Sequence, residues 1–129
     1  MNDVPYCANC FYAFDEINNA LVFKSKRDTN HIKYGLQNPN VAGTVLPDKL
    51  VKAKIQGIQF NGLFSEMNDA AIKKAEDVYY KRFPFARVFE GELWSIELTE
   101  IKMTDITLGF RKKIAWCKNN DLALEMLSA

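Results

Sequence analysis

The amino-acid sequence predicts a mainly β fold, a small antiparallel barrel of about six strands with two intervening helices. Several segments alternate apolar and polar residues, which is the period of a half-buried strand. In two long segments the alternation changes phase midway, and such a change indicates a strand that bends at a bulge. Only the segment from about Asp69 to Arg82 has the apolar spacing of a long helix. Because bent strands let a sheet curl on itself, a barrel is favoured over a flat sheet.

The first two strands are expected to pair as a hairpin. Residues 6–14 alternate in period two with mostly apolar side chains on both faces, which favours a well-buried first strand. The turn over residues 15–19 ends in two asparagines, a residue type that tolerates the positive φ of tight turns. Residues 20–25 (ALVFKS) then supply the second strand, because bulky apolar residues fill its first half.

The segment after the second strand has the residues of an anion-binding turn followed by a short helix. Asp28 or Thr29 can cap this helix, because either side chain offers an oxygen to an unpaired backbone N–H, and Pro39 ends it. The residues expected around the positive end of the helix are Ser25, Lys26, Arg27, Thr29 and His31. This arrangement predicts an anion site, above all for a phosphate. A solvated surface turn is the alternative, and it is favoured by the Asp28 carboxylate, which would repel an anion.

Two further strands and the long helix are expected in the middle of the chain. A third strand covers residues 41–46, where apolar and small residues resume. A longer strand over residues 51–64 changes its apolar parity at Gly57, which indicates a bulge or a sharp bend. Asn68 can cap the long helix, and Pro84 ends it.

The C-terminal third of the chain predicts two more strands. Residues 92–106 alternate again and change parity midway, so this strand is also expected to bend. Residues 110–116 supply the last strand. A short helical turn over residues 122–127 would follow, or the tail would fray.

Length and composition fit one soluble domain. The chain has 129 residues, of which 48% are hydrophobic, and this is enough to fill a single core. A formal net charge of +1 gives no general attraction to nucleic acid or to an anionic membrane. The sequence contains no apolar run long enough to span a membrane and no signal-peptide pattern. We therefore expect a cytoplasmic protein that binds neither nucleic acid nor membrane.

The cysteines and the lone histidine argue against several kinds of site. Cys7, Cys10 and Cys117 are an odd number without the spacing of a disulfide framework, which is typical of reduced thiols. Cys7 and Cys10 form a CxxC pair, but in the expected strand their side chains would point to opposite faces. His31 is the only histidine in the sequence, which argues against most hydrolase triads and against histidine-based metal sites. We therefore expect no metal centre.

A set of short motifs, in order from about Tyr6 to Trp116, resembles one known superfamily. The motifs are Cys7-Ala8-Asn9 with Phe11-Tyr12, Thr29-Asn30-His31, Asn38-Pro39-Asn40-Val41-Ala42-Gly43-Thr44, Gly57-Ile58-Gln59-Phe60-x-Gly62, Arg82-Phe83-Pro84-x-Ala86-Arg87, Glu100-Ile101-Lys102-Met103-Thr104-Asp105 and Leu108-Gly109-Phe110-x-Lys112-Lys113. They are similar to those of the pyridoxamine 5′-phosphate oxidase-like, FMN-binding superfamily, and more closely to those of its YhbP branch. The resemblance implies a six-stranded antiparallel split β-barrel with two or three short helices, forming one domain over residues 1–129.

The resemblance also implies a homodimer that binds FMN at the subunit interface. In flavin-binding relatives the phosphate is held by a hydroxyl at the end of the second strand and by hydroxyl and basic side chains at the helix start. The cofactor-binding residues that this resemblance indicates are Ser25, Lys26, Thr29, His31 and Gln59. His31 stands where the oxidases have a lysine. The N-terminal helix of relatives is not expected here, because the chain opens directly in the first strand.

Three functions fit the sequence. The first is an FMN-binding flavoprotein, an oxidoreductase of unknown substrate in which the isoalloxazine performs the redox step and few protein groups are needed. The second is a non-enzymatic dimeric binding protein whose pocket holds another anionic small molecule. The third is a structural dimer that binds a partner through its aromatic residues. No catalytic residue can be assigned from the sequence, and the substrate cannot be inferred.

Overall fold

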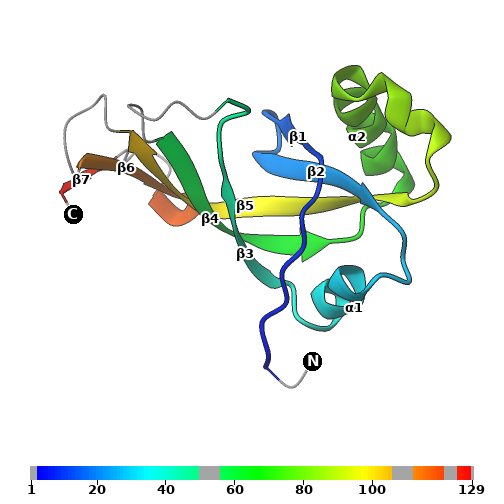
Figure 1. Cartoon of the computed structure of the whole chain (residues 1–129), viewed down its shortest axis with the longest axis horizontal. Helices are drawn as coiled ribbons and strands as arrows, with labels where there is room; N and C mark the ends of the chain where they lie inside the picture. The colour runs from blue at the N-terminus through cyan, green and yellow to red at the C-terminus, as the bar shows by residue number, and fades with distance from the viewer. Residues whose placement is uncertain (1–2, 50–55, 106–111, 121–124, 129) are drawn as a thin grey trace. The chain divides into compact units, whose positions relative to one another are not determined.

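A computed structural model describes residues 3–49, 56–105, 112–120 and 125–128 (Figure 1). The strands are β1 (Tyr12–Asp15), β2 (Ala20–Ser25), β3 (Asn40–Val45), β4 (Gln56–Ser65), β5 (Glu92–Asp105), β6 (Lys112–Cys117) and β7 (Glu125–Ser128). The helices are α1 (Asn30–Gln37), α2 (Asp69–Arg82) and two short 3₁₀ helices, η1 (Pro84–Val88) and η3 (Lys118–Asn120). The predicted mainly β fold with two α-helices is confirmed.

The strands form one sheet in the order β1-β2-β5-β4-β3, and β6 and β7 extend it from β5. The pairs β1–β2, β2–β5, β5–β6 and β6–β7 are all antiparallel. Among the described strands the pairing does not close into a ring. The helical turn predicted near the C-terminus is wrong for residues 125–128, which form β7. These residues pair with the edge of β6, and that pairing satisfies backbone groups in a way local sequence does not report.

β1 and β2 form the predicted hairpin. Asp15 closes the turn by accepting hydrogen bonds from the backbone N–H groups of Ile17 and Asn18 at 3.1 and 3.2 Å. Asn19 takes the expected positive φ, at 49°. The first strand is shorter than predicted, since residues 4–11 are exposed and lie outside any strand. In the register, Tyr12 is the first residue of β1 to pair, opposite Phe23, and β2 ends two residues later at Ser25.

The CxxC pair therefore lies in an exposed N-terminal segment, and its predicted placement in a buried strand is wrong. Cys7 and Cys10 are free thiols, as the sequence predicted. Ring contacts anchor the segment at both ends. Tyr6 stacks on Tyr34 of α1, with ring centroids 5.0 Å apart, and Phe11 contacts an aromatic ring just beyond α2 at 5.7 Å.

The chain separates into two compact units. One consists of Met1–Val41 with Leu63–Glu97, and the other of Ala42–Gly62 with Leu98–Ala129. The long strands β4 and β5 contribute residues to both units. That the whole chain is a single domain stays a prediction.

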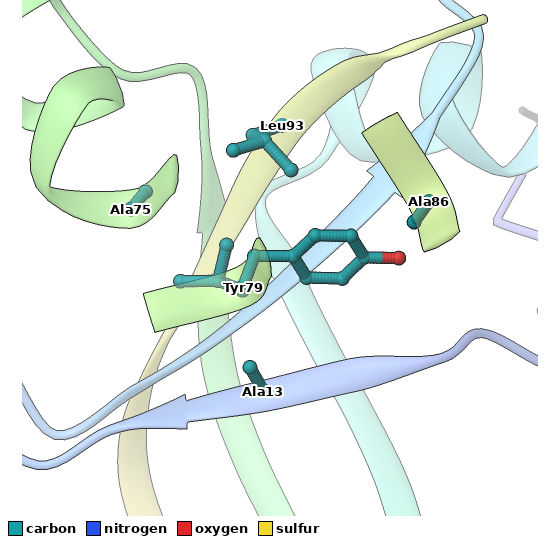
Figure 2. Close-up of a cluster of buried hydrophobic side chains, with 6 residues drawn as sticks. Ala13, Ala75, Tyr79, Ala86 and Leu93 are labelled. Atoms are coloured by element: carbon teal, nitrogen blue, oxygen red, sulfur yellow. The ribbon is translucent and has the colours of Figure 1, made fainter. Parts of the chain in front are cut away.

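The core of the first unit lies on both sides of β2, whose first four residues are all buried. Neighbouring residues of a strand point to opposite faces, so Val22 and Phe23 belong to different clusters. The cluster beneath α2 consists of Ala13, Val22, Ala75, Tyr79, Ala86 and Leu93 (Figure 2). The cluster that includes a residue of α1 consists of Phe23, Ile32, Phe64 and Trp94. Burial on two sides explains why β2 reads as a continuous apolar run.

The second unit contains most of β3, all of β6 and β7, and the adjoining parts of β4 and β5. Gly43 of β3 lies against a ring of β4: a Cβ at this position would be 2.5 Å from Phe60 Cζ. Gln56 at the start of β4 donates a 3.1 Å hydrogen bond to Asp105 at the end of β5. The parity change predicted at Gly57 involves residues 50–55, which lie outside the described residues. Within the described ranges, no helix has the length and apolar character needed to cross a membrane.

Candidate functional site

The last residue of β2, Ser25, is held in place from several directions. It pairs with Glu92 in the β2–β5 register. The indole N–H of Trp94 donates a 3.0 Å hydrogen bond to the Ser25 carbonyl oxygen. Gly91 has a φ of +140°, and a Cβ there would lie 3.2 Å from the Ser25 carbonyl carbon, so glycine permits a close backbone approach. These contacts fix the backbone from which the Ser25 hydroxyl projects.

Three polar side chains converge where the chain passes from β2 to α1. Ser25 Oγ lies 2.7 Å from His31 Nε2 and 3.2 Å from Thr29 Oγ1. Thr29 Oγ1 lies 3.4 Å from the same imidazole nitrogen and donates to the Lys26 carbonyl oxygen at 2.8 Å. The structure thus brings together three of the residues that the sequence placed at a phosphate site.

The first backbone N–H groups of α1 are not capped by the side chain of the N-cap residue. Thr29, not Asp28, is the N-cap residue, and its side chain makes no capping hydrogen bond to the helix. The first N–H groups of a helix have no partner within the helix, and they carry the positive end of its dipole. These donors lie beside the Ser25–Thr29–His31 cluster, which is the combination that an anion requires.

Lys26, the fourth predicted residue, is engaged elsewhere. Its ammonium forms a 2.8 Å ion pair with Glu90, and the two side chains are 56% and 83% exposed. The hydrogen bond and the charge of Glu90 raise the pKa of Lys26, and the same contact lowers the pKa of Glu90. Because the pair is so exposed, water screens it strongly and an anion could displace the carboxylate.

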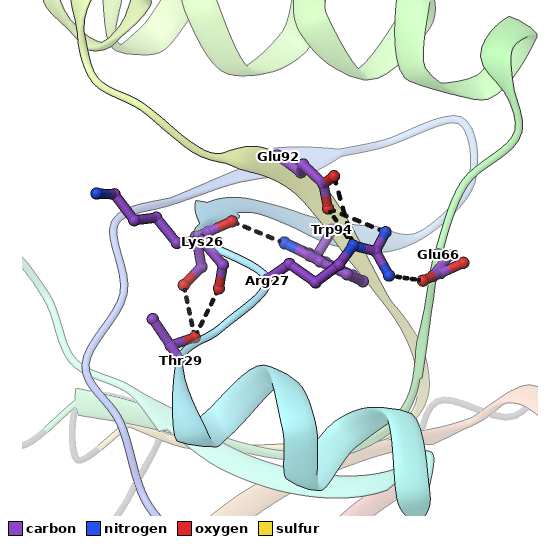
Figure 3. Close-up of polar contacts among 7 residues, drawn as sticks. Lys26, Arg27, Thr29, Glu66, Glu92 and Trp94 are labelled. Carbon is purple, nitrogen blue, oxygen red and sulfur yellow. Dashed lines mark hydrogen bonds and ion pairs between the residues drawn. The ribbon is translucent and has the colours of Figure 1, made fainter.

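Arg27 is held more firmly than Lys26. Its Nε and one terminal nitrogen contact Glu92 Oε2 at 3.1 and 3.0 Å, and its other terminal nitrogen donates to Glu66. The guanidinium carbon lies 4.9 Å from the centroid of the Trp94 ring. Figure 3 shows the Arg27 side chain across this ring, between the two carboxylates. The hydrogen bonds that Arg27 donates, to Glu66 first and to Glu92 second, raise its pKa.

The acidic neighbours of this turn are residues that sequence reasoning missed. Glu66, Glu90 and Glu92 lie far along the chain, and the fold brings them to the turn, Glu92 through the pairing of β2 with β5. Together they commit both cations of the turn to ion pairs. In this structure the charges of Lys26 and Arg27 are already matched by carboxylates, and the role of Lys26 at a phosphate site stays a prediction.

His31 supplies hydrogen bonding more than charge. Desolvation by burial lowers the pKa of His31 below its ordinary value of 6.5. The imidazole is thus mostly neutral near pH 7, and its Nε2 can either donate to or accept from the Ser25 hydroxyl.

Gln59, the fifth predicted cofactor residue, is exposed on β4 and belongs to the second unit. Its part in the site stays a prediction. Across the ranges that the structure describes, no group of three or more metal-ligating side chains is found.

Two solved structures have a similar fold. A heme-binding protein from Mycobacterium smegmatis matches with a TM-score of 0.71 at 10% identity, over 91% of this chain and 49% of that protein, so this chain spans about half its length. A pyridoxamine 5′-phosphate oxidase-related, FMN-binding protein from Nostoc punctiforme matches with a TM-score of 0.55 at 12% identity, over 93% of this chain and 77% of that protein. At such identities the likeness shows the fold alone. This likeness confirms the fold predicted from the motifs, which is similar to that of a pyridoxamine 5′-phosphate oxidase-related protein.

Sequence relatives are much closer in identity. A UPF0306 protein of Yersinia pestis is 43% identical over 113 residues, which cover 88% of this chain and 77% of that protein. UPF0306 proteins of Yersinia pseudotuberculosis and Yersinia enterocolitica are 43% and 42% identical over the same length. No family model matches the chain. The chain belongs to the UPF0306 family.

Proposed function

We propose that this protein binds FMN, with the flavin phosphate at the start of α1, and that it is a flavin-dependent oxidoreductase. The observation that carries the proposal is the convergence of Ser25 Oγ, Thr29 Oγ1 and His31 Nε2 within 3.4 Å of one another, beside a helix start without a side-chain cap. The FMN-binding neighbour of the same fold supports it.

The residues present fit a phosphate well. Two hydroxyls, one imidazole nitrogen and the first N–H groups of α1 can all donate to phosphate oxygens. Lys26 can add its charge by releasing the exposed Glu90. Bound FMN would supply the electron transfer, so the protein's task is to hold and orient it.

The phosphate contacts can be tested by titrating the protein with FMN and following flavin absorbance near ~450 nm. Replacing Ser25 and Thr29 together by alanine removes two hydroxyl donors. We expect the dissociation constant to rise roughly 10- to 100-fold, since the two lost hydrogen bonds together contribute about 1–3 kcal/mol. Ser65→Ala, an exposed serine at the end of β4, is the matched control and should bind as wild type does. Equal affinity of the double variant and wild type would move the phosphate elsewhere.

A non-enzymatic protein that binds an anionic small molecule is the second candidate. A mostly neutral His31 and two ion-paired cations favour it, because they leave little free charge for the strongly charged FMN phosphate. Adding a reduced nicotinamide to the FMN complex without air separates the candidates. An oxidoreductase that accepts hydride from it loses the flavin absorbance, whereas a binding protein keeps it.

We further propose a cytoplasmic homodimer. All three cysteines are free, as is usual in a reducing compartment. Large apolar side chains are exposed near α2, including Phe85 and Phe89 at 56% and 59%, and a second copy could cover them. Sedimentation should give twice the chain mass of 14.8 kDa. A mass of one chain at all concentrations would contradict the dimer.

A further inference from the structure

The Arg27 side chain ties the turn between β2 and α1 to two other strands of the first unit. Glu66 directly follows β4, and Glu92 is the first residue of β5. Both carboxylates accept from the guanidinium, which lies over the ring of Trp94. The same indole donates its N–H to the Ser25 carbonyl oxygen. We call the group Arg27, Glu66, Glu92 and Trp94 the Arg27 clamp.

All three nitrogens of the guanidinium are engaged by carboxylates in this clamp. A planar guanidinium matches carboxylates in a fixed geometry and also stacks on an aromatic ring, which a flexible ammonium does not reproduce. If Arg27 left the clamp for a phosphate, Glu66 and Glu92 would remain close to a dianion without a partner. That outcome is unfavourable because like charges would then face each other.

We propose that Arg27 is a positioning residue for the phosphate site and not a phosphate ligand. The clamp fixes the turn after β2. It thereby holds the Ser25 hydroxyl 3.2 Å from the hydroxyl of Thr29, the residue at which α1 starts. The inference rests on the proposed function, since it assigns a role in binding the same phosphate.

The two roles predict opposite effects for the double variant Glu66→Gln with Glu92→Gln. Removing two carboxylates makes the turn more positive, so a ligand role for Arg27 predicts tighter FMN binding. A positioning role predicts weaker binding, because neutral amides hold the guanidinium less firmly and the donors lose their alignment. We expect the dissociation constant for FMN to rise roughly 3- to 10-fold, the loss of about one well-placed hydrogen bond.

The matched control is Glu76→Gln with Asp77→Asn, two exposed positions on α2 that change the net charge by the same amount. It should leave FMN affinity unchanged. Riboflavin, which lacks the phosphate, provides the second comparison: the clamp variant should lose its preference for FMN over riboflavin, whereas a variant that merely destabilised the fold would weaken both alike.

Amide hydrogen exchange of the free protein tests the clamp without any flavin. The Thr29 N–H donates to the Lys26 carbonyl oxygen at 3.2 Å, and it should exchange faster in the clamp variant than in the control. Tighter FMN binding, or unchanged Thr29 exchange, in the clamp variant would overturn the inference. If wild type binds no FMN, the proposed function fails, and Thr29 exchange still decides whether the clamp orders the turn.

Discussion

The two faces of β2 in the first unit differ in what their cores are made of. The face beneath α2 has mainly aliphatic buried residues, three of them alanines, around the ring of Tyr79 (Figure 2). The other face is aromatic: Phe64 stacks on Trp94 at 5.3 Å and lies 6.2 Å from Phe23. The polar cluster at the start of α1 borders the aromatic face. The reason is that Trp94 fills the core and also offers an indole N–H to the end of β2.

Two neighbouring residues of β2 show the same division. Lys24 donates to Tyr80 Oη at 2.8 Å and to the Ala86 carbonyl oxygen at 2.9 Å, so its charge serves to join β2 to α2 and η1. Ser25 instead faces Thr29 and His31. The polar residue on one face, Lys24, therefore contributes to stability, whereas the polar residue on the other face, Ser25, belongs to the candidate phosphate site.

The largest effects should come from truncating the two cores. Only 1% of the surface of Trp94 is exposed, so Trp94→Ala should lower the free energy of unfolding by about 3–5 kcal/mol. Leu93→Ala, on the α2 face, should cost about 2–3 kcal/mol. Urea denaturation measures both, and in the folded fraction only the Trp94 change should also weaken FMN binding.

Trp94→Phe separates the core role of this residue from its indole N–H. It retains a ring but loses the donor to Ser25, so FMN affinity should fall while most stability is kept. Wild-type affinity for FMN in this variant would show that the aromatic face supports the site through volume alone.

An intermediate effect is expected from the neighbouring pair Lys24 and Ser25. Lys24→Met should lower stability by about 1–2 kcal/mol, because the Ala86 carbonyl oxygen loses its donor, and FMN affinity should stay the same. Ser25→Ala should change stability by less than about 0.5 kcal/mol and raise the dissociation constant for FMN about 3- to 10-fold. If both variants changed stability and affinity alike, the division between the faces would be disproved.

The smallest effect concerns pH and His31. The pKa of this imidazole is lowered in the folded protein, so the unfolded chain binds the proton more readily. This residue's contribution to stability should therefore decrease as pH falls below about 6.5, and it should be constant above that value. Urea denaturation of wild type and His31→Asn between about pH 5 and 8 measures the difference. Parallel profiles would mean that His31 titrates normally.

FMN should reverse the direction of this shift, because a phosphate dianion favours the charged imidazole. FMN affinity should then weaken as pH rises through the bound-state pKa of His31. His31→Lys should bind more tightly at about pH 8 and vary little between about pH 7 and 8, since lysine stays charged and the phosphate is mostly dianionic there. Identical pH profiles for wild type and His31→Lys would place His31 away from the phosphate and favour the binding-protein candidate.

The sequence by itself determined the parts whose interactions are local. The hairpin turn depends on Asp15 and the asparagines that follow it, and α2 on its cap at Asn68, which accepts from the Ala71 N–H at 2.8 Å. The polar cluster was also predictable, because Ser25 and His31 are only six positions apart. Periodicity, capping and turn chemistry act over such short distances, so they can be read without knowing the fold.

Only the tertiary structure decided which distant residues surround the turn. Arg27 and Glu92 are 65 positions apart, and Trp94 reaches Ser25 across 69 positions, both because β2 pairs with β5. The choice of strand partner depends on which pairing buries the most apolar surface across the whole sheet, and alternation within one strand does not carry that information. A sequence that indicates two cations beside a phosphate thus folds into a turn whose cations are already paired.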